Sequence, residues 1–144
     1  MKVSELIQSR KEVFLITEDM TVHDAARYLR DKQVRAVGVR GSDGQLVGLV
    51  SQSDISVKVA AENKCPAWMR VSEIMSRGLI TVTPQTPLEE CLLLMEQYGF
   101  FHLPVVDKEQ GYRGLVSAKD LLKVIASDQK ARADMLESFI FQDH

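Results

Sequence analysis

Residues 48–55 read Gly-Leu-Val-Ser-Gln-Ser-Asp-Ile, and residues 114–121 read Gly-Leu-Val-Ser-Ala-Lys-Asp-Leu, so one motif occurs twice at a displacement of 66 residues. The correspondence continues upstream through the same order of strand and helix patterns, which indicates a tandem repeat. Each unit is too small to bury its apolar face alone, so we expect the two units to pack together. A ligand is expected to bind at the seam between them.

The two copies align over nearly their whole length. Residues 3–7 match residues 71–75 at a displacement of 68, and from Ile16 onward the displacement is 66. The two-residue difference falls between Ile7 and Ile16, where a surface loop can change length at little cost. We expect a first repeat at 1–60, a connecting segment at 61–70, a second repeat at 71–127 and a tail at 128–144.

Each repeat is predicted to have the element order β-α-β-β-α. Branched residues at 13–17 and 79–83 predict the first strand of each repeat. Apolar residues at i, i+3, i+4 and i+7 predict a helix after each of these strands, from Val22 and from Leu88. Two strands joined by a polar turn follow in each repeat, and the shared motif then begins a second helix. The predicted fold class is α+β.

Charge and composition exclude several classes of protein. With 18 basic and 20 acidic residues the net charge is −2, so no overall field attracts nucleic acid or an anionic membrane. Residues 1–12 are too polar for a signal peptide or a membrane span. The two cysteines, Cys65 and Cys91, lack metal-type spacing and suit a reducing compartment. We therefore expect a cytoplasmic protein in which any phosphate binding is local.

The sequence lacks the motifs of the common enzyme classes. It has no Gly-rich phosphate loop, no H-E-x-x-H and no nucleophile elbow. The histidines His23, His102 and His144 are far apart in sequence, with no acid–base partner pattern. We expect no catalytic residues, no bound metal and no required cofactor.

The repeated Gly-hydrophobic-Val-Ser-x-x-Asp motif, together with His-Leu-Pro-Val-Val-Asp at 102–107, resembles a cystathionine-beta-synthase (CBS) domain. Two in tandem resemble a CBS pair, or Bateman module, over Val3 to Ile125. The resemblance implies two three-stranded sheets with helices, packed about a pseudo-twofold axis. It also implies that AMP, ADP, ATP or S-adenosylmethionine binds in the clefts between the repeats and regulates a protein partner.

The motif residues suit an adenosine ligand. Asp54 and Asp120 can accept hydrogen bonds from ribose hydroxyls, and Ser51 and Ser117 can donate to an anion with the amides of the following helix. The resemblance implies that each cleft combines the motif of one repeat with the residue that ends the first strand of the other. One cleft would then hold Ser51, Ser53, Asp54 and Thr83, and the other Ser117, Lys119, Asp120 and Thr17.

The resemblance also implies that phosphate partners lie at the start of the second strand, where the candidates are Arg35 and His102. His102 aligns with Ala36, so Arg35 stands one position early and could face the other side of its strand. Lys119 stands where the first motif has Ser53, so the two sites are not equivalent. The sequence does not decide which site is preferred.

Each candidate also has a purely structural interpretation. Ser-x-x-Asp is a capping box at a helix start, and Arg35 and His102 could be solvated strand ends. Phe100 and Phe101 offer a stacking surface for a purine, although such pairs more often pack in a core. The alternative function is a ligand-free scaffold that dimerises or holds a partner.

Two further segments concern assembly. Trp68, in the connecting segment, is expected to pack on the seam. The tail ends in an apolar stretch at 135–141, so we expect it to be helical and to dock either on its own module or on a second copy. The resemblance favours a homodimer, because members of the family form dimers.

Overall fold

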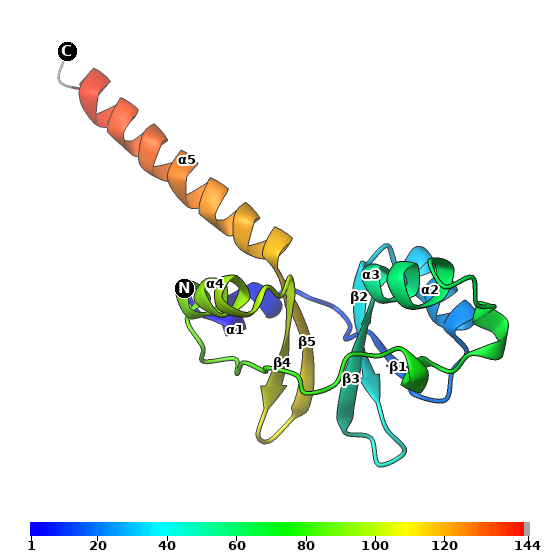
Figure 1. The fold of residues 1–144 in the computed structure, drawn as a ribbon. Coiled ribbons are helices and arrows are strands. Elements are labelled where there is room, and N and C mark those ends of the chain that lie inside the picture. Colours follow the sequence, from blue (N-terminus) through cyan, green and yellow to red (C-terminus); the bar gives the residue numbers. More distant parts are fainter. Residues whose placement is uncertain (143–144) are drawn as a thin grey trace.

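The computed structural model describes the backbone of residues 1–142 and the side chains of these residues except those at 132, 136 and 138–142. The chain forms two α+β halves, with one long helix extending from the second half (Figure 1). The main elements are α1 (Val3–Ile7), β1 (Leu15–Thr17), α2 (Val22–Lys32), β2 (Ala36–Arg40), β3 (Leu46–Ser51), α3 (Gln52–Ile55), α4 (Leu88–Tyr98), β4 (His102–Asp107), β5 (Gly111–Ser117) and α5 (Ala118–Gln142).

The first half contains a three-stranded sheet in the order β1-β2-β3. β1 runs parallel to β2 and places Thr17 opposite Arg40, whereas β2 and β3 are antiparallel and place Ala36 opposite Ser51. α2 begins at a conventional cap, in which Thr21 Oγ1 accepts from the Asp24 amide at 3.1 Å. A π-helical turn at Ser56–Ala60 extends α3.

The second half differs from the three-stranded sheet implied by the resemblance. β4 and β5 form an antiparallel pair, and residues 79–83 contribute a single parallel bridge between Val82 and Val105. The Val82 amide donates to Pro104 O at 2.9 Å, and Val82 O accepts from the Val106 amide at 2.8 Å. Pairing stops there because the Thr83 amide donates to Thr86 Oγ1 and Pro84 has no amide hydrogen.

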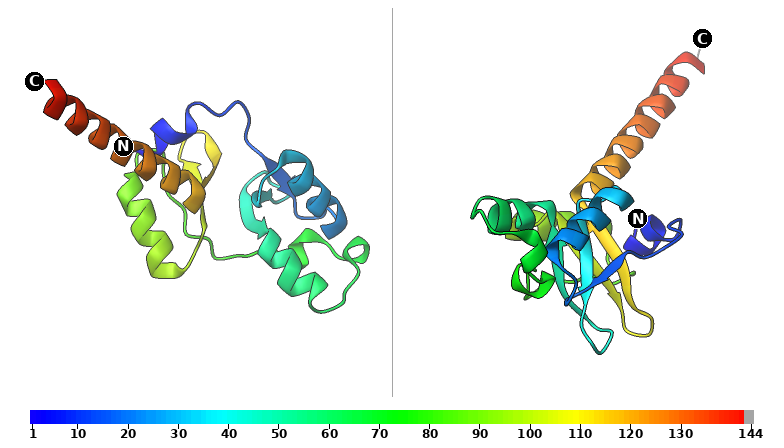
Figure 2. Two further views of the ribbon diagram at one scale, coloured as in Figure 1. Left: turned by 90° about the horizontal axis from the view of Figure 1, so that it is seen from above. Right: turned by 90° about the vertical axis from the view of Figure 1, so that its right-hand side faces the viewer.

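The first segment of each repeat packs in the core of the other half. Val3 and Ile7 of α1 belong to the core of the second half, where the Val3 amide donates to Thr86 O at 2.9 Å. Val71 and Ile74 belong to the core of the first half, where the Val71 amide donates to Met20 O at 2.8 Å. The packing units therefore do not coincide with the sequence repeats, and the chain crosses the seam at residues 8–14 and again at 76–80 (Figure 2).

The two sheets face each other across the seam, and α2, α3 and α4 lie on the outer sides (Figure 2). β2 contacts β5 directly, and the ring of Tyr112 lies against Gly38. A Cβ atom at residue 38 would lie 2.7 Å from that ring, so any other residue there would require the Tyr112 ring to move. This contact explains why the first repeat has Gly38 where the second has Pro104.

Two expectations about the outer segments need correction. Trp68 is 85% exposed, because the short turn Pro66–Trp68 contacts the outer helix α2 rather than the seam. The tail continues α5 as one helix to Gln142, and this helix points away from the two halves instead of folding back on them (Figure 1). Docking of the tail on a second copy stays a prediction, and residues 143–144 lie outside the described part.

Candidate ligand-binding site

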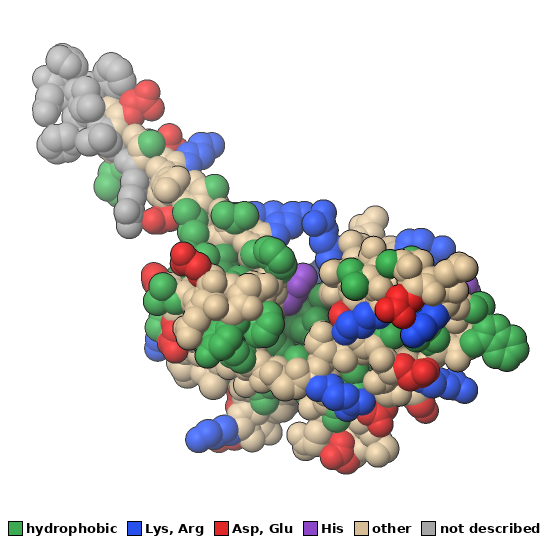
Figure 3. Space-filling model, in the orientation of Figure 1, with side chains coloured by type: hydrophobic (Ala, Val, Ile, Leu, Met, Phe, Trp, Pro, Cys, Tyr) green, Lys and Arg blue, Asp and Glu red, His purple; other side chains and the backbone are tan. Residues whose placement is uncertain are grey.

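Two adjoining pockets lie between the halves, and each is lined by both repeats. The first pocket, of about 850 Å³, is lined by residues 51–54 together with 75–80 and 99–102 of the second repeat. The second pocket, of about 660 Å³, is lined by residues 117–120 together with 10–14 and 33–37 of the first repeat. Arg35, Phe101 and His102 line both pockets. The space-filling view shows a hollow between the halves with hydrophobic side chains inside it (Figure 3).

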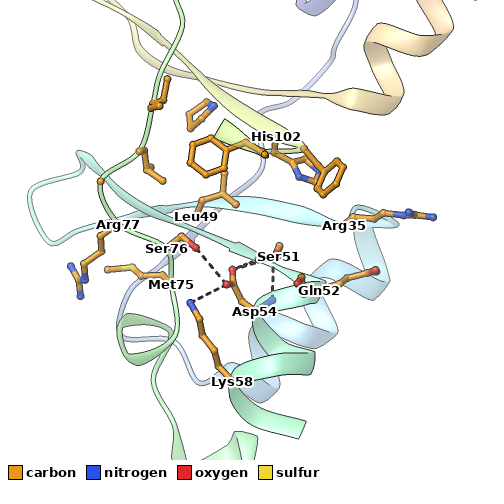
Figure 4. A pocket seen from close by; sticks show the side chains of 18 residues that line it. Arg35, Leu49, Ser51, Gln52, Asp54, Lys58, Met75, Ser76, Arg77 and His102 are labelled. Atoms are coloured by element: carbon orange, nitrogen blue, oxygen red, sulfur yellow. Dashed lines mark hydrogen bonds and ion pairs between the residues drawn. The ribbon is translucent and has the colours of Figure 1, made fainter. Parts of the chain in front are cut away.

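In the first pocket the motif forms a capping box whose aspartate also contacts a residue of the other repeat. The Ser51 amide donates to Asp54 Oδ2 at 2.9 Å, and the Asp54 amide donates to Ser51 Oγ at 3.1 Å. Asp54 is 9% exposed and also pairs with Lys58 Nζ at 3.1 Å and Ser76 Oγ at 3.4 Å (Figure 4). Because Ser76 belongs to the second crossing segment, Asp54 contacts both repeats.

The motif of the second repeat forms the same capping box at the second pocket, but a different cation pairs with its aspartate. The Ser117 amide donates to Asp120 Oδ2, and the Asp120 amide donates to Ser117 Oγ, both at 3.0 Å. Arg10 Nη2 lies 2.9 Å from Asp120 Oδ2, and Arg10 Nη1 donates to Leu115 O. Arg10 belongs to the first crossing segment, so this aspartate too is joined to the other repeat.

Arg35 and His102 lie at the edge of the sheets where the helices begin. Ala36 is opposite Ser51 and His102 is opposite Ser117, so each second strand starts beside a motif. Burial lowers the pKa of His102, the Arg35 charge adds to this effect, and the Asp120 charge opposes it. Arg35 lines both pockets, so its offset of one residue in the alignment does not remove it from the site.

The structure differs from the expectation for Thr17 and Thr83, because neither residue lines either of these two pockets. Since β1 runs parallel to β2, the end of β1 lies beside Arg40, at the edge opposite the motif. Thr17 instead hydrogen-bonds Asp19, an interaction that lowers the pKa of that carboxyl, and Thr83 Oγ1 lies 3.2 Å from Thr86 Oγ1. The residues that enter the pockets precede the first strands, at 10–14 and 76–80.

Aromatic side chains border the pockets instead of filling a core. Phe100 is 40% exposed and stacks on Tyr98 with ring centroids 5.9 Å apart, and Phe101 is 72% exposed. Phe100 lines the first pocket and Phe101 lines both. These rings leave apolar surface available for a planar ligand.

Sequence reasoning missed three side chains that contact the motif aspartates. Lys58 follows Asp54 by one helical turn, a spacing that favours an ion pair. Arg10 and Ser76 align at the displacement of 66, but they lie where the repeats differ in length. That region was interpreted as a tolerant surface loop, and the register across it was ambiguous.

The described residues contain no group of three or more His, Cys, Asp or Glu side chains placed to hold a metal ion. Cys65 is exposed and Cys91 is buried, and burial raises the pKa of the Cys91 thiol to about 11. Within this described part, no helix combines the length and apolarity needed to span a membrane.

Comparison with known proteins decides the family. The family description of the CBS domain matches residues 3–60 and 71–127. The chain belongs to the CBS domain family. It is a tandem CBS pair with mixed α and β structure, as the motifs predict.

Curated relatives carry this CBS pair within longer chains. The chain is 29% identical to the mitochondrial CBS domain-containing protein CBSX3 of Arabidopsis thaliana over 86% of its own length and 62% of the relative. It is 30% identical to a homoserine O-acetyltransferase of Methanohalobium evestigatum over 80% of its own length but only 22% of the enzyme. The chain therefore spans less than two thirds of these proteins.

Solved structures match the CBS pair over nearly their full length. A protein with CBS domains from Burkholderia ambifaria superposes with a TM-score of 0.82 at 28% identity, covering 90% of this chain and 96% of that one. The CBS pair of protein MJ0100, solved with 5′-methylthioadenosine and S-adenosyl-L-methionine, gives 0.77 at 25% identity, covering 87% and 99%.

Proposed function

We propose that this CBS pair is a regulatory module that binds adenosine-containing ligands, of the class of AMP, ADP, ATP or S-adenosylmethionine, between its repeats and signals to a protein partner. The observation that carries the proposal is the placement of each motif aspartate against the crossing segment of the other repeat, at the wall of a pocket. A ligand held there touches both halves at once.

The pocket walls offer what an adenosine ligand requires. Asp54 and Asp120 supply acceptors for ribose hydroxyls, and Ser51, Ser53 and Ser117 supply donors beside a helix start. Phe100 and Phe101 supply surface for the purine. Arg35 and Lys119 supply charge for phosphate. The CBS pair of MJ0100 supports this ligand class, since it was solved with two adenosine compounds.

Signalling follows from where the ligand contacts lie. Arg10 holds Asp120, and Ser76 contacts Asp54, so ribose binding competes with contacts made by the crossing segments. These segments join each core to the first segment packed in the other half. A ligand that favours one arrangement of the halves shifts the population toward it, and a partner that distinguishes the arrangements detects the ligand.

Titration of the whole chain with AMP, ADP, ATP, S-adenosylmethionine and 5′-methylthioadenosine tests the proposal. A ligand at 100 times its Kd stabilises the folded state by about 2.7 kcal/mol, so we expect a clear rise in Tm for at least one of them. Calorimetry gives the stoichiometry, with guanosine monophosphate as the control for non-specific nucleotide binding. No change in Tm and no heat with any adenosine compound at millimolar concentration would contradict it.

A dimerising scaffold is the second candidate, and exposed apolar side chains favour it. Leu93 of α4 is 63% exposed, and Leu122 and Met135 of α5 are 64% and 73% exposed. We expect removal of residues 129–144 to convert a dimer into a monomer in light scattering, because it removes more than half of the projecting helix together with the exposed Met135. The control is the full chain at the same concentration, and a truncated chain that remains dimeric would show that the tail is not the contact.

A further inference from the structure

The two pockets differ in charge although they are built from equivalent parts of the repeats. Three Lys or Arg side chains and one carboxylate line the first pocket. Six Lys or Arg side chains and two carboxylates line the second pocket. His102 adds little positive charge to either, because burial lowers its pKa. The six cations of the second pocket are Arg10, Lys11, Arg35, Arg113, Lys119 and Lys123.

Most of the excess charge in the second pocket is uncompensated. Both of its carboxylates are already paired, Glu12 with Lys32 at 3.1 Å and Asp120 with Arg10 at 2.9 Å. Lys11, Arg35, Lys119 and Lys123 form no ion pair with any residue in the described part of the chain. In the first pocket Lys58 is neutralised by Asp54, so that within the described residues two cations, Arg35 and Arg77, are left without an ion pair, against four in the second pocket.

The internal repeat shows that two of these lysines are specific to the second pocket. At the displacement of 66, Lys119 stands where the first repeat has Ser53, and Lys123 where it has Val57. Lys119 is in the first turn of α5, where a positive charge is unfavourable to the helix dipole. Helix stability therefore does not account for Lys119, whereas the charge would be favourable beside an anion bound at this helix start.

The chemistry of the ligand follows from this charge. Lysines one helical turn apart present two mobile ammonium groups on one face, which suits a chain of phosphates better than a single one. An uncharged 5′ group leaves the four free cations without a counter-charge. A triphosphate brings several negative charges, which strengthen each contact with the helix amides and the lysines.

Resting on the proposed function, we infer that the second pocket selects adenosine di- or triphosphate, whereas the first pocket takes an adenosine ligand of low charge. The module then has two unlike inputs, one set by the phosphorylation state of the nucleotide and one independent of it. Because both pockets share Arg35 and His102, occupancy of one affects the other.

Exchange of the matched residues tests this inference by calorimetry with ATP, AMP and 5′-methylthioadenosine. Replacing one exposed ion-pair partner changes affinity by about fivefold, so Lys119→Ser with Lys123→Val should weaken ATP binding at one site by about 25-fold. Binding of 5′-methylthioadenosine should be unchanged. The reciprocal variant, Ser53→Lys with Val57→Lys, should strengthen ATP binding at the other site by a similar factor. Raising the salt concentration should weaken ATP binding more than nucleoside binding.

The outcomes separate this inference from the proposed function. Failure of the wild-type chain to bind any of the three compounds overturns both. If the wild-type chain binds 5′-methylthioadenosine but binds AMP and ATP with equal affinity, the inference alone is overturned. The same holds if both exchange variants bind ATP with the affinity of the wild-type chain. Since all four exchanged side chains are exposed or partly exposed, circular dichroism is expected to show the same fold in each variant.

Discussion

Replacing Ile7 by alanine should lower the free energy of unfolding by about 2–5 kcal/mol, as expected for a buried isoleucine that leaves a cavity. Ile7 is 5% exposed and lies in the core of the second half, although its sequence belongs to the first repeat. The loss of protection should therefore be greatest in β4 and β5. Chemical denaturation measures the first effect, and hydrogen–deuterium exchange locates the second.

Ile74→Ala is the matched control, because it makes the same chemical change in the other exchanged segment. Ile74 is 1% exposed in the core of the first half, so its loss should raise exchange in β1, β2 and β3 instead. If Ile7→Ala raised exchange in the first half only, or cost less than about 1 kcal/mol, the packing of α1 described above would be wrong.

The exchange of first segments bears on the proposed regulation. Residues 8–14 and 76–80 connect an element packed in one half to a strand packed in the other, and both segments line the pockets. A ligand that shifts either segment therefore acts on the connection between the two cores. Under the proposed function, this arrangement would link pocket occupancy to the relative position of the halves without any long-range pathway.

The repeat period and the family resemblance together were sufficient to predict the fold class and the order of the elements from sequence. A motif that recurs in register with the strand and helix patterns fixes the order of elements, and the family resemblance then supplies their arrangement. The packing of residues 3–7 in the second half and of residues 71–75 in the first half was not predicted. Sequence similarity shows that the two segments are equivalent, but it does not show in which core each one packs. The third strand of the second half was overpredicted, because β propensity does not register the loss of pairing at Thr83 and Pro84.

The lining of the two pockets differs from the predicted one where strand direction matters. The sequence located Ser51, Asp54, Ser117 and Asp120 correctly at the starts of helices, since the capping pattern is local. It assigned Thr17, at the end of β1, to the pocket. Because β1 pairs in parallel with β2, the end of β1 lies at the edge of the sheet away from the motif, and the residues before β1 line the pocket. Trp68 was predicted to pack on the seam, but the size and apolarity of a residue do not show which surface of the protein it occupies.

Replacing Asp54 by alanine should both destabilise the chain and abolish one binding site. Asp54 receives hydrogen bonds from the Ser51 amide and hydroxyl and pairs with Lys58, so its removal should cost about 2–3 kcal/mol of unfolding free energy. If it also accepts from a ribose hydroxyl, affinity at the first pocket should fall by about 10- to 100-fold. Denaturation and calorimetry with 5′-methylthioadenosine measure the two effects separately.

Two controls distinguish ligand binding from helix capping. Thr21→Ala removes the cap of α2 away from the pockets, so it should cost about 1 kcal/mol while leaving ligand affinity unchanged. Asp120→Ala should weaken the second site and leave the first intact, with a smaller loss of stability because Asp120 is more exposed than Asp54. If Asp54→Ala lowered stability but every ligand bound as before, the aspartate would serve the helix alone. The ribose acceptor of the first pocket would then have to be another group.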